Sequence, residues 1–202
     1  MPLWIAAQPL VLASKSQIRG RLLAAAGLRF GIRPAHIDER AAEARAGAMD
    51  APAAAALLAR AKADAVAATQ TGHLVLGADQ TLALGDRRFS KPVNRAEAVQ
   101  QLRALRGQTH ALHSALALVS DGKVLFELVD TARLTMRDFS DRFLDDYLEM
   151  AGDTALGSVG GYQLEGIGIH LFERVEGDYF TILGLPLLPL LAYFRKSGFV
   201  DG

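Results

Sequence analysis

The chain of 202 residues is half apolar and contains 22 basic and 22 acidic residues, so it can bury a sizeable core and carries no net charge. This balance argues against binding to nucleic acid or to an anionic membrane through the overall electrostatic field. The chain contains no cysteine, which excludes disulfides and thiolate metal sites and agrees with a cytoplasmic location. We expect a single domain over 1–202, with neither an export signal at its start nor a membrane span.

The first predicted unit is a strand followed by a helix. The apolar run Leu10–Ala13 predicts a buried strand, and Ser14 and Ser16 are suited to cap a helix that ends near Gly27. Basic residues, among them Arg19, cluster about the start of this helix, where free backbone N–H groups favour phosphate. The alternative is a solvated basic turn, which is the commoner role of such residues.

A second helix is predicted over 53–69, and it has a lysine on its apolar side. At about 100° per residue, Lys62 falls within the arc that Leu58 and Val66 define. An unpaired buried ammonium group is costly. The Lys62 side chain must therefore either extend to solvent or meet an anion.

An acidic residue follows the next predicted strand, Leu74–Ala78. Asp79 would lie at the carboxyl end of this strand, where ligands of α/β sheets gather, and its carboxylate could bind Mg²⁺ or accept a proton from water. The alternative is a turn aspartate that ends the strand. Lys91 follows the turn at Gly85-Asp86, so it is predicted on a loop or a strand end, with its backbone restricted by Pro92. The alternative is an exposed loop lysine without a special role.

The rest of the chain predicts further helices and strands. In chain order they are a helix over 94–105 with Asn94 as its cap, strands over 111–119 and 124–129 joined by a turn at 121–122, and a third strand over 132–136. They are followed by a helix that Ser140 caps and that ends near Gly152, a strand over 169–175 and a helix that starts at Pro186. Strands mixed with helices and a hairpin predict an α/β or α+β sheet protein in which part of the sheet is antiparallel.

Four segments contain short motifs in a defined order. They are L-A-S-K-S-Q-I-R-G-R-L-L at 12–23, D-E at 38–39, G-A-D-Q-T at 77–81 with K-P at 91–92, and G-G-Y-Q-L-E-G-I-G at 160–168 with V-E-G-D-Y-F-T-I-L-G-L-P-L at 175–187. Each string alone is a modest signal, and the ordered set is specific. Taken together and in order, the segments resemble the Maf family from about Leu10 to Phe194, and Lys62 matches a lysine on the family's intervening helix.

The resemblance implies an enzyme that hydrolyses a non-canonical nucleoside triphosphate to its monophosphate and pyrophosphate, with Mg²⁺ or another divalent cation such as Mn²⁺ as cofactor. It also implies an extended mixed sheet flanked by helices, with two lobes around a central cleft, as in inosine-triphosphate pyrophosphatases. The residues carried over as catalytic are Asp79, Lys91, Lys62 and Glu39, of which Asp79 and Glu39 would also bind the metal. Those carried over as substrate-binding are Ser14, Ser16, Arg19, Ile18, Gln80 and Glu165.

Three of these positions resemble those with which the family selects a base. The branch that acts on dTTP and UTP has Arg, Thr and Gln where this chain has Ile18, Gln80 and Glu165. Gln80 and Glu165 match the branch that hydrolyses 7-methyl-GTP, while Ile18 replaces an aromatic residue of that branch. The resemblance leaves a second function open, that of a regulatory binding protein in septum formation or division arrest, and it also implies a homodimer.

Overall fold

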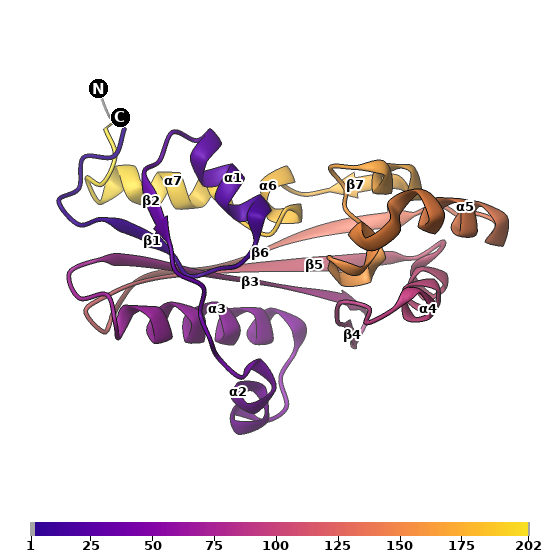
Figure 1. Cartoon of the computed structure of the whole chain (residues 1–202), viewed down its shortest axis with the longest axis horizontal. Helices are drawn as coiled ribbons and strands as arrows, with labels where there is room; N and C mark the ends of the chain where they lie inside the picture. The colour runs from indigo at the N-terminus through magenta and orange to yellow at the C-terminus, as the bar shows by residue number, and fades with distance from the viewer. Residues whose placement is uncertain (1–2, 202) are drawn as a thin grey trace.

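A seven-stranded sheet runs through the computed structural model, which describes residues 3–201 (Figure 1). The strand order is β2-β1-β3-β5-β6-β7, and β4 pairs with β3 outside this path. The strands are β1 (Leu10–Leu12), β2 (Phe30–Ile32), β3 (Leu74–Leu84), β4 (Arg87–Phe89), β5 (Thr109–Ser120), β6 (Lys123–Met136) and β7 (Phe172–Glu176). Because β1 is parallel to β2 and β3 while the other pairs are antiparallel, the mixed sheet expected from the sequence is confirmed.

Short polar side chains begin most of the helices by accepting a backbone N–H bond from the third residue beyond them. The helices are α1 (Gln17–Ala25), α2 (Glu39–Ala46), α3 (Ala51–Ala67), α4 (Arg95–Leu105), α5 (Asp141–Ala151), α6 (Tyr179–Ile182) and α7 (Leu187–Lys196). The caps predicted at Ser16, Asn94 and Ser140 are confirmed, whereas α2, which Asp38 caps, was not predicted. Within residues 3–201, none of the helices combines the length and hydropathy needed to span a bilayer.

Helices cover both faces of the sheet at the end that carries β1. α3 lies against one face, and α1 and α7 lie against the other (Figure 1). Side chains of β3 alternate between them, since Val75 packs toward α3 whereas Leu74 and Leu76 pack toward α1 and α7. At Gly77 a Cβ atom would lie 2.8 Å from the backbone nitrogen of Ala63 in α3, so the helix can approach this closely only because glycine is there.

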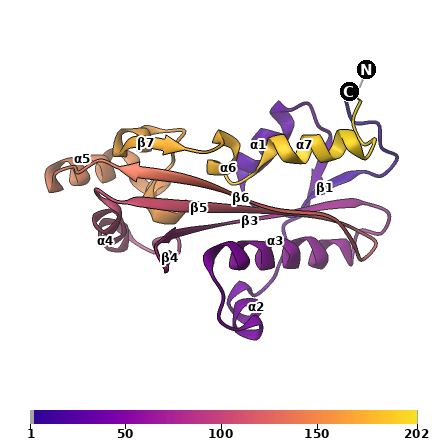
Figure 2. The same ribbon diagram turned by 180° about the vertical axis from the view of Figure 1, so that it is seen from behind.

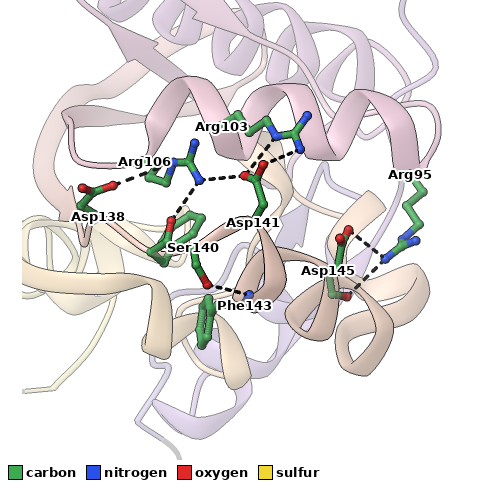
Figure 3. Close-up of polar contacts among 9 residues, drawn as sticks. Arg95, Arg103, Arg106, Asp138, Ser140, Asp141, Phe143 and Asp145 are labelled. Atoms are coloured by element: carbon green, nitrogen blue, oxygen red, sulfur yellow. Dashed lines mark hydrogen bonds and ion pairs between the residues drawn. The ribbon is translucent and has the colours of Figure 1, made fainter.

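A separate core fills the other end of the sheet, where α4 and α5 lie (Figure 2). Leu102 of α4 and Leu134 of β6 are fully buried in it. Polar contacts join α4 to the start of α5, because the Asp141 carboxylate accepts hydrogen bonds from Arg106 Nη1 at 2.8 Å and from Arg103 Nη2 at 3.0 Å (Figure 3). The molecule therefore has the two lobes that the family resemblance implies.

Several predicted boundaries are wrong. Asp79 does not end its strand, because β3 continues beyond it. The run 132–136 is the second half of β6 rather than a third strand. The strand predicted over 169–175 starts only at Phe172, since a 3-10 helix precedes it. Pro186 caps α7 instead of forming its first residue.

Candidate active site

An open cleft of about 1420 Å³ lies between the two lobes. Its walls come from α1 and the segment before it, from α2 and α3, from β3, and from the segments 88–93 and 157–165. The ten residues that the sequence analysis singled out all line this cleft. They are Ser14, Ser16, Ile18, Arg19, Glu39, Lys62, Asp79, Gln80, Lys91 and Glu165.

The cleft meets β3 where one edge of this strand has no neighbouring strand. β1 pairs with 74–76 and β4 pairs with 82–84, so the segment 77–81 has only β5 beside it. Asp79 and Gln80 lie in this open segment. Because successive strand residues point to opposite faces of a sheet, the two side chains reach the cleft from opposite faces.

Two carboxylates converge on the ammonium group of Lys62. Nζ lies 2.5 Å from Asp79 Oδ1 and 2.7 Å from Oε1 of Glu39, the first residue of α2. Only 14% of the Lys62 side chain and 11% of the Asp79 side chain are exposed, against 51% for Glu39. Of the two alternatives that the sequence left open for this lysine, the structure shows the one in which it meets anions.

The surroundings of Asp79 change the pKa of its carboxyl group. Burial raises the pKa of this carboxyl above its ordinary value, and although the charges of Lys62 and Arg19 lower it, they do not cancel the effect of burial. Oδ1 accepts the hydrogen bond from Lys62. Among residues 3–201 no group donates to Oδ2, so this oxygen is available to accept a proton from a water molecule in the cleft.

Three acceptors hold Arg19 in the wall of the cleft. Nε donates to the carbonyl of Gly184 at 2.7 Å, and Nη1 donates to the carbonyl of Ala78 at 2.8 Å and to Ser14 Oγ at 3.2 Å. Burial lowers the pKa of Arg19, while the nearby charge of Asp79 opposes this change. An arginine keeps its proton in such surroundings, so the cleft contains a fixed positive charge.

The start of α1 lies in the same wall. Ser16 caps the helix, since its Oγ accepts a hydrogen bond from the backbone of Arg19 at 3.4 Å, and Ser14 Oγ accepts one from the backbone of Ser16 at 3.2 Å. The backbone N–H groups of a helix start attract anions. Ser16 therefore shapes this part of the cleft mainly through the helix that it caps.

The amide of Gln80 has a single orientation that its neighbours allow. Nε2 lies 3.1 Å from the carbonyl oxygen of Thr181, 3.0 Å from that of Ile182 and 2.9 Å from Ser114 Oγ. Carbonyl oxygens can only accept hydrogen bonds, so the nitrogen must face them and Oε1 must face away. Gln80 therefore has an acceptor left for a ligand in the cleft.

Glu165 reaches the cleft from a tightly folded loop of the other lobe. The backbone of Gly166 donates to Gln163 O at 3.2 Å, and a Cβ atom at Gly168 would lie 3.0 Å from the carbonyl carbon of Gln163. This close packing fixes the loop, while the Glu165 side chain stays exposed. Ile18 faces the same cleft from α1.

One charged pair in the cleft was not predicted from the sequence. Arg88 of β4 places Nη2 2.5 Å from Oε2 of Glu43 in α2, and both residues line the cleft. The signal was the spacing of Glu39 and Glu43, which puts two carboxylates on one face of a helix. This spacing places the two carboxylates on one face only if the segment is helical, and α2 was not predicted as a helix.

The residues of the cleft fit a divalent cation that arrives with a nucleotide. Asp79 and Glu39 both place an oxygen within 2.7 Å of one nitrogen atom, so their carboxylates converge on a point already occupied by positive charge. Among residues 3–201 no group of three or more His, Cys, Asp or Glu side chains is placed to hold a metal. Mg²⁺ in nucleotide sites commonly uses one or two carboxylates together with substrate phosphates, and this pair of carboxylates matches that pattern.

A family model and two full-length relatives match nearly the whole chain. The family described as "Maf-like protein" matches residues 9–197. A nucleoside triphosphate pyrophosphatase of Nitrobacter winogradskyi is 54% identical over 98% of this chain and 98% of its own length. A 7-methyl-GTP pyrophosphatase of Rhizobium etli is 54% identical over 96% of this chain and 98% of its own. The solved structure of a HAM1 protein from Coxiella burnetii covers 65% of this chain and 74% of its own, with 18% identity and a TM-score of 0.41. From the family match and these full-length relatives, the chain belongs to the Maf family.

Proposed function

We propose that this protein hydrolyses a nucleoside triphosphate to a nucleoside monophosphate and pyrophosphate. The observation that carries the proposal is the convergence, in one cleft, of a buried carboxylate at Asp79 with the cations Arg19, Lys62 and Lys91. A triphosphate requires several positive groups around it, and a water molecule that attacks phosphorus requires a base nearby. Full-length relatives that are named nucleoside triphosphate pyrophosphatases support the same reaction.

In the proposed reaction, Asp79 takes a proton from water while the water oxygen forms a bond to the α-phosphorus. The bond from that phosphorus to the oxygen bridging to the β-phosphorus breaks, and pyrophosphate leaves. Arg19, Lys62 and Lys91, with the Ser14 hydroxyl, bind phosphate oxygens and offset the negative charge that builds up on them. A bound Mg²⁺ or Mn²⁺, held by Asp79 and Glu39, would neutralise charge on the leaving group.

For the substrate we propose a modified purine nucleotide such as 7-methyl-GTP. The guanine edge presents N–H donors, and both Gln80 Oε1 and the Glu165 carboxylate are acceptors that line the cleft. Methylation at N7 gives the base a positive charge, which a carboxylate such as that of Glu165 favours. Ile18 supplies an apolar surface in place of a stacking aromatic ring.

The test of the reaction is Asp79→Asn. We expect this variant to stay folded while kcat falls roughly a hundred- to ten-thousand-fold, the range for loss of a general base. Pyrophosphate release is measured from a panel of nucleoside triphosphates, with Mg²⁺ and with a chelator. A folded variant with unchanged turnover would remove Asp79 from the mechanism.

The test of base choice is Glu165→Gln, which keeps the size of the side chain and removes its charge. We expect the preference for 7-methyl-GTP over GTP to decrease, because the attraction between the carboxylate and the cationic base is lost. Rates for both nucleotides are compared in the variant and the wild type. Equal rate ratios in the two proteins would show that Glu165 does not select the base.

We place this reaction in the cytoplasm, because a chain without cysteine gains nothing from an oxidising compartment. The alternative function, regulation of septum formation or cell division through a protein partner, does not require the carboxylate of Asp79. The same Asp79→Asn variant separates the two functions. If the variant loses both its turnover and its effect on cell division, the enzyme function is favoured. If the variant affects cell division as the wild type does, the binding function is favoured.

A further inference from the structure

We infer that Arg88 is a further substrate-binding residue, which binds the β- and γ-phosphates, and that Glu43 occupies it until substrate arrives. The inference rests on the proposed function, because it assumes that a polyphosphate enters the cleft. The geometry that points to this role for Arg88 consists of two ion pairs, both of which involve the short helix α2. Glu39 of α2 contacts Lys62, and Glu43 of α2 contacts Arg88.

The two ion pairs are spaced on the scale of a polyphosphate. Glu39 and Glu43 are four residues apart, which is about 6 Å along a helix axis. Their cationic partners come from two elements: Lys62 of α3 contacts Asp79 in the open segment of β3, and Arg88 of β4 pairs with Ala83 just beyond that segment. Lys91, three residues after Arg88, lines the same cleft. A chain of phosphates lying along these cations would meet the positive charges that the two glutamates now neutralise.

Little apolar packing holds α2 in its place. The helix has no fully buried residue, and in both views it stands away from the sheet, beyond α3 (Figures 1 and 2). Ion pairs at such exposed positions are weak, since solvent screens them. An anionic ligand can therefore displace the carboxylate of Glu43 from Arg88 without opening a core.

Arg88 has the chemistry to bind two phosphate oxygens. Its guanidinium offers five N–H donors, and among residues 3–201 its one acceptor is the Glu43 carboxylate, bound through Nη2. About 36% of the side chain is exposed to the cleft and solvent. A guanidinium binds phosphate through paired hydrogen bonds, so the exchange of a carboxylate for a phosphate retains the same type of contact.

The experiment compares Arg88→Ala and Glu43→Gln, because the two variants separate a binding role from a structural one. Dissociation constants for inorganic tripolyphosphate and KM for the best nucleotide are measured, with thermal unfolding as the check on folding. We expect Arg88→Ala to weaken tripolyphosphate binding roughly ten-fold or more, as for loss of a charged hydrogen-bond donor. We expect Glu43→Gln to act in the opposite direction and strengthen binding a few-fold, because Arg88 is then free of a competing anion.

The matched control is Arg87→Ala, which removes the same charge from the neighbouring position of β4. Arg87 lies over the ring of Phe89, with Cζ 4.5 Å from the ring centre, and it does not line the cleft. We expect this variant to bind tripolyphosphate as the wild type does. The double variant Glu43→Gln with Arg88→Ala should match Arg88→Ala alone, since Glu43 acts only through the arginine.

Two results would overturn the inference. If Arg88→Ala and Glu43→Gln weaken binding to the same extent, the pair only anchors α2. If Arg88→Ala behaves as Arg87→Ala, the guanidinium does not reach the ligand. Failure of the proposed function has a different signature, because the wild type would then release no pyrophosphate from any nucleotide while tripolyphosphate binding still depended on Arg88.

Discussion

Lys62 and Asp79 are 17 positions apart in the chain, and their side chains lie 2.5 Å apart in the cleft. Helical periodicity predicted that this lysine lies on the apolar side of its helix and so needs solvent or an anion. It could not identify the anion, because a partner on another element depends on how α3 packs against β3. The family motifs, rather than the periodicity, singled out both residues, and the side-chain geometry explains why the two belong together.

The decrease of kcat/KM at low pH should depend on the interaction between Lys62 and Asp79. Asp79 must be ionised to accept a proton, and burial raises its pKa, so kcat/KM should fall as the pH decreases through a value above that of an ordinary aspartate. Lys62→Met removes a charge that lowers this pKa, and the decline should therefore begin at a higher pH. The measurement is kcat/KM from about pH 4 to about pH 9 for both proteins. If kcat/KM of the wild type and of Lys62→Met falls at the same low pH, the charge of Lys62 does not influence the pKa of Asp79.

The same shift in pKa has a defined effect on stability. The folded chain binds the proton of Asp79 more tightly than the unfolded chain does, so the free energy of unfolding decreases as the pH rises from the ordinary pKa through the raised one. At neutral pH the ionised Asp79 thus costs stability. Thermal unfolding of the Asp79→Asn variant at neutral pH should give a Tm at or above that of the wild type, and this is why loss of turnover in the variant can be attributed to chemistry.

At the scale of elements, two wrong strand boundaries come from polar residues inside strands. The predicted strand ended before Asp79 because Asp, Gln and Thr follow in sequence, yet each of these finds a partner and β3 continues. The predicted strand before 132–136 ended before Asp130, which lies inside β6 and whose Oδ2 accepts a hydrogen bond from Thr181 Oγ1 of α6 at 2.5 Å. A rule that assigns polar residues to turns therefore ends a strand too early where such residues hydrogen-bond to specific partners.

The short elements were missed for another reason. β2 and β4 have three residues each, which is too short for a periodic pattern. Three helix caps were predicted correctly, because a cap depends on its own residue and on a neighbour three positions on. Asn94 is one such case, with Oδ1 accepting the N–H of Glu97 at 2.9 Å.

The packing of α3 on β3 can be tested at Gly77. A methyl group at this position would press against the backbone of α3, so Gly77→Ala should reduce the free energy of unfolding by about 1–3 kcal/mol, as overpacking does. Gly31→Ala in β2 is the control, because the nearest atom to its added Cβ would be Val11 Cγ2 at 3.9 Å. Denaturant unfolding of the two variants gives the comparison. A loss of stability at Gly31 as large as that at Gly77 would show that close approach to α3 is not the cause.

At the scale of the whole molecule, the sheet carries one core on each face near β1 and a third core at the far end. The order of family motifs along the chain was sufficient to predict the mixed sheet and the cleft. Composition and periodicity were not sufficient to predict the cleft, since it depends on where separate strands end relative to one another. The homodimer expected from the family stays a prediction, which sedimentation of the purified protein can test.

The stretch of β3 between its two short neighbours has a wider consequence. The gap along this edge of β3 is as wide as it is because β1 ends at Leu12, opposite Leu76, and β4 ends at Phe89, opposite Leu82. Lengthening either strand by a few residues would satisfy more backbone groups and would also fill the space. Incomplete strand pairing therefore provides the space in which a substrate can bind. A variant selected only for a more regular sheet should lose substrate binding while it still folds.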